Sequence, residues 1–239
     1  MTFGELEIGA FVATFLRAIG LAVTSPVIGD NDVSKRARLV FVLAIACAVG
    51  PTREGVAYSV LAQTGMLELA VGLLTGLTAR FVMARVAIAG QLIGLSLGLG
   101  FAAQYDARAG ESAGTFRMLV STIAALAFLA AGGLEEIVRS AAAGPARVDH
   151  LLSLAPALIE AGTSAFGHGL ALASPILLAA LVGNVGLALM NRAAPAANVF
   201  SIALAAVLVI GGLVLLATAS GFVSGVIEVA RNAVSGFLQ

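Results

Sequence analysis

The stretch that decides the fold is Phe166–Thr218, which reads FGHGLALASPILLAALVGNVGLALMNRAAPAANVFSIALAAVLVIGGLVLLAT. It contains two long apolar runs that meet at residues 191–195. No charged residue occurs between Arg192 and Glu228. A helix of about 20 apolar residues crosses the ~30 Å hydrocarbon core of a bilayer. Each run therefore predicts a helix long enough to span a membrane.

The composition of the whole chain supports the same conclusion. Of its 239 residues, 60% are hydrophobic and 11% are charged, and the formal net charge is zero. Soluble proteins average about 25% charged residues. We therefore predict an all-α, integral membrane-type protein. Nucleic-acid binding is not expected, because phosphate neutralisation requires clustered cations and the only basic cluster is Lys35, Arg36 and Arg38.

Two charged residues interrupt apolar segments. Arg17 lies in the apolar segment 8–28, where an arginine facing lipid costs about 2.5 to 3.5 kcal/mol. It is expected to face protein or water, or to reach the headgroups along a tilted helix. Glu68 divides the segment 55–79. A structural ion pair or hydrogen bond is the favoured reading of this carboxylate, and a proton-carrying role is the alternative.

The remaining segments predict a bundle of uneven helices. Segment 39–52 is too short to span comfortably, segments 55–79 and 86–105 are separated by Arg80 and Arg85, and a further apolar segment covers 118–134. Residues 135–154 mix charged and apolar residues and are expected to form an amphipathic helix or a loop. Pro145 is expected to end any helix that enters this segment. Kinks or helix breaks are expected at Pro175 and Pro195. The predicted fold is thus one of kinked and broken helices and helical hairpins.

Glycines recur at four-residue intervals in two of these segments. Such spacing places them on one helix face, where a second backbone can approach closely. The partner backbone can belong to this chain or to a neighbouring subunit, and the pattern favours neither. The residues are Gly72, Gly76, Gly90, Gly94 and Gly98.

The chain lacks the common signatures of catalysis and metal binding. It has no GxxxxGK[ST] phosphate loop, no HExxH motif and no paired cysteines. Its two histidines, His150 and His168, have no evident ligand set. Cys47, the sole cysteine, lies in an apolar run and is expected to be buried and unreactive. We therefore expect no enzyme activity, no metal and no cofactor.

The junction between the two apolar runs carries a family resemblance. Residues 192–200 resemble the R-x-x-P-x-x-N-V-F signature of the FliR/SctT family, with Arg192, Pro195 and Asn198 at its polar and proline positions. Further matches follow in order along nearly the whole chain: Arg17, Pro26, Glu68, Gly72, Gly76, Ala89, Gly90, Ile93, Gly94, Gly98, Asp106, Gly132, Gly133, Ser140, Pro145 and Pro175. The chain departs from the family pattern at Ser34, Ala107, Glu135 and Ala196.

The resemblance implies a subunit of the type III protein export gate, which carries unfolded flagellar or effector proteins across the bacterial inner membrane. The single export-gate domain 1–239 would comprise a FliP-like part, 1–160, and a FliQ-like C-terminal hairpin, 161–239. FliP and FliQ homologues, FlhB and FlhA homologues, export substrates and membrane lipid are the implied partners. The implied location is the flagellar basal body.

The resemblance also assigns roles to particular residues. A loop of this subunit helps to plug the closed pore in the family, and the matching stretch here contains Gln104, Tyr105, Asp106, Arg108 and Glu111. The structural junction and the polar residues within helices are Arg17, Glu68, Pro175, Arg192, Pro195 and Asn198.

Two alternatives stay open at the level of the sequence. A small-molecule secondary transporter or channel acting alone also uses broken helices and buried charges. It predicts inverted repeats, and none is evident between the two halves of the chain. The sequence also does not distinguish a flagellar system from an injectisome.

Overall fold

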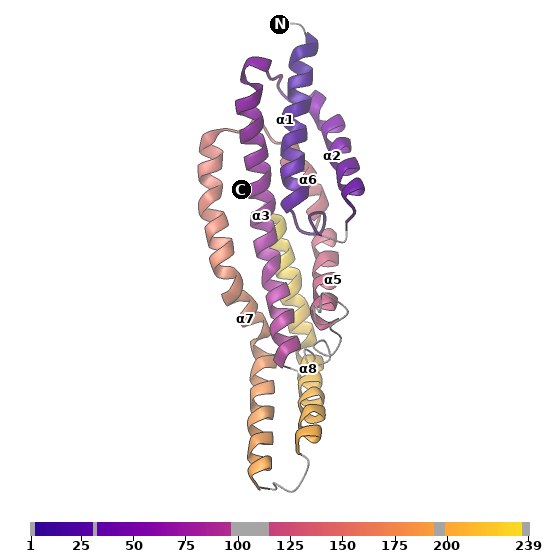
Figure 1. The fold of residues 1–239 in the computed structure, drawn as a ribbon, viewed down its shortest axis with the longest axis vertical. Coiled ribbons are helices and arrows are strands. Elements are labelled where there is room, and N and C mark those ends of the chain that lie inside the picture. The colour runs from indigo at the N-terminus through magenta and orange to yellow at the C-terminus, as the bar shows by residue number, and fades with distance from the viewer. Residues whose placement is uncertain (1–2, 31–32, 97–114, 194–198, 236–239) are drawn as a thin grey trace. The chain divides into compact units, whose positions relative to one another are not determined.

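The computed structural model describes residues 3–30, 33–96, 115–193 and 199–235 (Figure 1). Within these ranges the chain forms seven α-helices and one short 3-10 helix, and no strand. The all-α, membrane-type fold expected from the composition is confirmed. The helices are α1 (Phe3–Thr24), α2 (Lys35–Val49), α3 (Tyr58–Ser96), α5 (Thr115–Ala130), α6 (Gly133–Ala142), α7 (Val148–Ala193) and α8 (Val199–Ser235), with η1 (Gly50–Thr52) after α2.

The chain divides into two compact units. The first unit comprises residues 1–83, 125–164 and 230–239, and the second comprises 84–124 and 165–229. In the first unit, α2 lies beside α1 (Figure 1) and buries Val42, Ile45, Ala46 and Val49. A second cluster in this unit joins α3 to the start of α7 through Val71 and Leu154. Close van der Waals packing of these apolar side chains stabilises the unit.

The second unit packs parts of three helices against one another. Its buried residues are Ala89 and Ile93 of α3 with Ala173 and Ile176 of α7. Half-buried side chains of α8, including Val214 and Phe222, complete this core. Small residues at the centre allow the helices to approach closely. Within this unit α7 and α8 form the two arms of a helical hairpin.

One predicted interruption is wrong. Residues 55–79 and 86–105 were expected to form separate segments, whereas α3 continues without a break from Tyr58 to Ser96. Arg80 and Arg85 interrupt the apolar pattern but not the helix, because arginine is a good helix former. The charge of Arg80 is paired with Asp30 at 3.1 Å. The two arginines therefore do not mark the end of a helix.

A kink or a helix break was expected at Pro175, and the break is wrong. Helix α7 runs from Val148 to Ala193 and includes Pro156 as well as Pro175. The ring of Pro175 lies on an exposed side of the helix, and its neighbour Ile176 is buried. Ala173 and Ile176, close to it in the chain, pack in the core of the second unit and stabilise the helix despite the backbone hydrogen bond that proline cannot donate. Pro195 lies outside the described residues.

A genuine bend occurs between α5 and α6. The two helices meet at 57° across a short break. Gly132 at this break has φ of +90°, a left-handed conformation that L side chains rarely adopt. The apolar segment predicted over 118–134 is therefore divided here, because α5 ends at Ala130 and α6 begins at Gly133. The ten-residue helix α6 that follows buries one face, in agreement with the amphipathic character expected for this region.

Much apolar surface of the single chain is exposed. Four helical stretches are long and apolar enough to cross a membrane, namely Leu6–Thr24, Tyr58–Ser96, Leu151–Gly186 and Gly212–Val234, and the bent pair α5 and α6 is a fifth candidate. Helix α2, with 15 residues, is too short to qualify, as expected. Cys47 on α2 is exposed, so its expected burial is wrong. Its helix turns that side away from α1.

Candidate functional site

A buried ion cluster lies in the first unit. Glu68 of α3 pairs with Arg17 of α1 through Nε and Oε2 at 2.5 Å, and with Arg53 through Nη2 and Oε1 at 2.8 Å. The exposed fractions of the three side chains are 1% for Glu68, 1% for Arg17 and 7% for Arg53. The side chain of Arg17 therefore does not extend to the lipid headgroups. It is buried within the protein, where it pairs with the carboxylate of Glu68.

The same cluster holds the connection between α6 and α7. Arg17 donates from Nη1 to the carbonyls of Ser140 (3.2 Å) and Ala143 (2.9 Å), and from Nη2 to that of Gly144 (2.9 Å). These carbonyls lie at the C-terminal end of α6, where the helix dipole favours a cation. The backbone N–H of Ala146 donates to Glu68 Oε1 at 3.0 Å. Residues far apart in the chain are thus crosslinked through two charged side chains.

Arg53 completes the cluster from the connection between η1 and α3. Its Nη2 also donates to the carbonyl of Gly144 at 3.1 Å, and its Nη1 donates to the hydroxyl of Thr14 at 3.4 Å. Two guanidinium groups therefore share one carboxylate, and they also donate to backbone carbonyls and to the Thr14 hydroxyl. Such charge-assisted bonds are stronger than neutral ones. The arrangement fastens α1, α3 and two connections together, and it presents no unoccupied carboxylate to a substrate.

Glycines allow α1 and α3 to approach beside this cluster. A Cβ placed on Gly72 would lie 2.3 Å from the carbonyl oxygen of Arg17, and one on Gly76 would lie 2.9 Å from the backbone nitrogen of Ser25. Gly20 of α1 faces α3 in the same way, 2.7 Å from the backbone nitrogen of Leu73. The backbone contact that the four-residue spacing suggested here is made within the chain. Gly90 and Gly94 are buried in α3, and Gly98 lies outside the described residues.

The other residues singled out by the sequence do not join this cluster. Pro175 and Arg192 of α7 are exposed in the single chain. Pro195 and Asn198 lie outside the described residues, as do the plug-loop residues Gln104, Tyr105, Asp106, Arg108 and Glu111. The structure brings Arg17, Glu68, Gly72 and Gly76 together, and only these.

Sequence reasoning missed Arg53, Gly20 and the carbonyls at the end of α6. Arg53 is separated from Glu68 by 15 residues and lies outside any helix, so no periodic spacing relates the two. The sequence around Pro51, just before Arg53, does not indicate that the arginine has a buried partner. Gly20 lacks a second glycine four residues away that would mark a packing face. The only available signal was that a lone buried arginine and a lone buried glutamate each require a partner.

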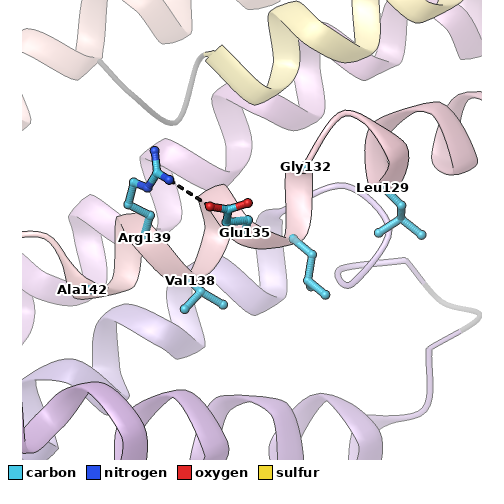
Figure 2. Close-up of a pocket in the computed structure, with 7 residues that line it drawn as sticks. Leu129, Gly132, Glu135, Val138, Arg139 and Ala142 are labelled. Carbon is cyan, nitrogen blue, oxygen red and sulfur yellow. Dashed lines mark hydrogen bonds and ion pairs between the residues drawn. The ribbon is translucent and has the colours of Figure 1, made fainter.

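A shallow pocket of about 580 Å³ lies at the bend between α5 and α6 (Figure 2). Leu129, Leu134 and Val138 line it, and Arg139 pairs with Glu135 at its edge with 2.9 Å between Nη2 and Oε1. This lining offers no nucleophile or metal-ligand set. In the described part of the chain, no group of three or more His, Cys, Asp or Glu residues is placed to hold a metal ion.

Comparison with known proteins identifies the family. Residues 8–233 match the sequence profile described as bacterial export proteins, family 1. The chain belongs to this family. The resemblance noted in the sequence is thereby confirmed, and the match covers both structural units.

Related proteins carry a common name. The flagellar biosynthetic protein FliR of Escherichia coli (strain K12) is 30% identical over 205 residues, which is 82% of this chain and 78% of that protein. The protein of the same name from Caulobacter vibrioides is 28% identical over 219 residues, 85% of each chain. That of Aquifex aeolicus is 28% identical over 214 residues, 85% of this chain and 82% of the relative.

Proposed function

We propose that this chain is a subunit of a flagellar type III protein export gate in the bacterial inner membrane. The observation that carries the proposal is the family match over residues 8–233. The name that the relatives share, flagellar biosynthetic protein, supports the flagellar assignment. The chain would form part of the channel wall through which unfolded flagellar proteins leave the cytoplasm.

The exposed apolar surface supports a role within an assembly. In the second unit α7 and α8 expose large apolar side chains, with exposed fractions of 71% at Val182, 64% at Leu189 and 75% at Leu216. Surfaces of this kind mark contacts with protein or lipid. We propose that FliP and FliQ homologues cover part of this surface, that FlhB and FlhA homologues lie nearby, and that 161–239 acts as a FliQ-like hairpin after a FliP-like part.

The export-gate proposal is tested by recovery of the partners. The tagged full-length chain is expressed in a flagellated bacterium, extracted in mild detergent, purified and analysed by mass spectrometry. FliP and FliQ homologues are the expected co-purifying chains. A chain that purifies alone and moves a small solute in liposomes would instead be a transporter, and the proposal would be wrong.

The plug role is a separate proposal that rests on the resemblance of the loop between α3 and α5. Deletion of residues 107–113 is expected to make the closed gate leak ions, which patch-clamp recording or a dye-influx assay would detect. A variant with the same seven positions replaced by Gly and Ser keeps the loop length and separates side-chain contacts from simple shortening. Unchanged conductance in both variants would contradict the plug assignment.

A further inference from the structure

The turn between α1 and α2 contains a strained residue. Val27 has φ of +70°, and it is the only non-glycine residue with positive φ in the described ranges. The backbone N–H of Ile28 donates to the carbonyl of Pro26 at 2.9 Å, which makes Pro26–Ile28 a three-residue γ-turn of the rare positive-φ form. A β-branched side chain is a conformational outlier at such an angle. The turn therefore adopts this geometry only because other contacts impose it.

The surroundings of the turn add to its cost. Ser25 is completely buried, and its hydroxyl has no hydrogen-bond partner among the residues that the structure describes. A buried, unsatisfied hydroxyl is unfavourable relative to one in water. Gly29 fits this position because it has no Cβ, and one there would lie 2.5 Å from the carbonyl oxygen of Val23. Opening of the turn would relieve both the positive φ of Val27 and the burial of the Ser25 hydroxyl.

Two arginines hold the turn in place. Arg38 of α2 donates from Nε to the carbonyl of Ile28 (3.1 Å) and from Nη2 to that of Asp30 (3.0 Å). Arg80 of α3 pairs with the Asp30 carboxylate at 3.1 Å and donates to the carbonyl of Gly29 at 3.4 Å. The Asp30–Arg80 pair is open to solvent, with exposed side-chain fractions of 51% and 41%. Exposed pairs are weak and are screened by salt.

From this balance we propose that residues 25–30 form a two-state joint that Arg38 and Arg80 hold in its strained state. Loss of the Asp30–Arg80 contact lets Val27 return to negative φ and exposes the Ser25 side chain. The joint thus links the packing of α2 and α3 to the end of α1. It requires no partner chain and is independent of the export-gate proposal.

A cysteine reporter at position 25 tests the joint. Ser25→Cys is introduced together with Cys47→Ser, which removes the exposed native thiol. The rate of maleimide labelling is measured on the full chain in native membranes. Slow labelling is expected, because the side chain is buried. Asp30→Asn should raise the rate roughly fivefold, the size of effect expected from losing one exposed ion pair.

Two further comparisons separate opening of the joint from loss of the fold. Val27→Gly, added to Asp30→Asn, should restore slow labelling, because glycine adopts positive φ without a Cβ penalty. Salt at about 0.5 M should speed labelling of the parent but not of Asp30→Asn. Arg36→Ala is the control, since Arg36 is exposed and makes no side-chain ion pair or hydrogen bond within the described residues.

The proposal is overturned by any of three results. These are fast labelling of the parent reporter, no change on Asp30→Asn, or failure of Val27→Gly to slow the labelling that Asp30→Asn accelerates. General unfolding caused by Asp30→Asn would persist with glycine at position 27, so the rescue experiment would expose it. An Arg36→Ala variant that labels as fast as Asp30→Asn would likewise count against a specific clamp.

Discussion

Glu68 is the centre of the buried ion cluster in the first unit. Its carboxylate pairs with two guanidinium groups and accepts a hydrogen bond from one backbone N–H. Arg17 also donates hydrogen bonds to three carbonyls at and beyond the end of α6. Removing charges from water is costly, and a buried pair is favourable only when the geometry and the added hydrogen bonds compensate. Loss of one member then leaves the others desolvated without compensation.

Glu68→Leu is therefore expected to destabilise the chain by about 3 to 5 kcal/mol, because two buried guanidinium groups lose their carboxylate. The measurement is the thermal midpoint of the detergent-solubilised chain, followed by the far-UV circular dichroism of its helices. Glu135→Ala is the matched control, since its pair with Arg139 is 72% and 58% exposed and should be worth at most about 1 kcal/mol. Equal losses in the two variants would contradict a special role for the cluster.

Gly72 offers a second test at the residue scale. Alanine in place of glycine normally stabilises a helix interior by about 1 kcal/mol. Gly72→Ala should nevertheless destabilise, because the new Cβ would meet the Arg17 carbonyl oxygen at 2.3 Å. Gly167→Ala is the control, since nothing lies within 4 Å of a Cβ there and a small gain is expected. A thermal midpoint that rises in both variants would show that α1 and α3 do not approach closely.

At the scale of the elements, polar residues and prolines act differently from what a linear pattern suggests. Helix α3 passes Arg80 and Arg85, and α7 passes Pro156 and Pro175, without a break in either. The bend between α5 and α6 is instead made by one glycine in a left-handed conformation. Backbone conformation thus controls the path of the chain here more than side-chain polarity does.

Gly132→Ala is expected to destabilise the bend by about 1 to 2 kcal/mol, the usual penalty for a Cβ in the left-handed region. No atom of the described residues lies within 4 Å of a Cβ at this position, so the effect would be conformational rather than steric. Gly144→Ala is the control, because it is equally open and has no positive φ. Paired spin labels on α5 and α6 would report a change of the 57° angle, and an unchanged distance and thermal midpoint would contradict the argument.

For the whole molecule, the exposed apolar side chains are the main fact to explain. Both lipid and neighbouring subunits can contact an apolar surface. They differ in how well they accommodate a larger side chain on it. Hydrocarbon chains accommodate a larger ring, whereas a packed protein interface is overfilled by it. This difference makes the export-gate proposal testable on a single side chain.

Leu216→Trp is expected to reduce recovery of FliP and FliQ homologues with the tagged chain about tenfold, as overpacking by about 1 to 3 kcal/mol implies. The side chain of Leu216 is 75% exposed in the single chain, so the folded monomer has room for the ring. Leu216→Met is the control, because it keeps the volume. Normal recovery with tryptophan would place this position against lipid.

The sequence alone was sufficient for the fold class and the family. Helices and a membrane environment follow from the uncharged runs in 161–227, because burial of apolar surface and satisfaction of the backbone are local requirements. The family resemblance rested on the signature at 192–200 together with matches in the same order along nearly the whole chain, and all of these are read directly from the sequence. The positions of Arg17 and Glu68 within apolar segments also indicated that each side chain needs a polar or oppositely charged partner.

Only the tertiary structure decided which partners these are. The pairing of Glu68 with Arg17 and Arg53, and of Arg17 with the end of α6, joins residues between 15 and 127 positions apart. Such contacts depend on where separate helices cross, and no periodicity in the chain encodes that crossing. The same holds for the exposed side of α2 that carries Cys47 and for the strained turn at Val27. Burial and strain arise from the sum of distant contacts, whereas apolar patterning arises from neighbours.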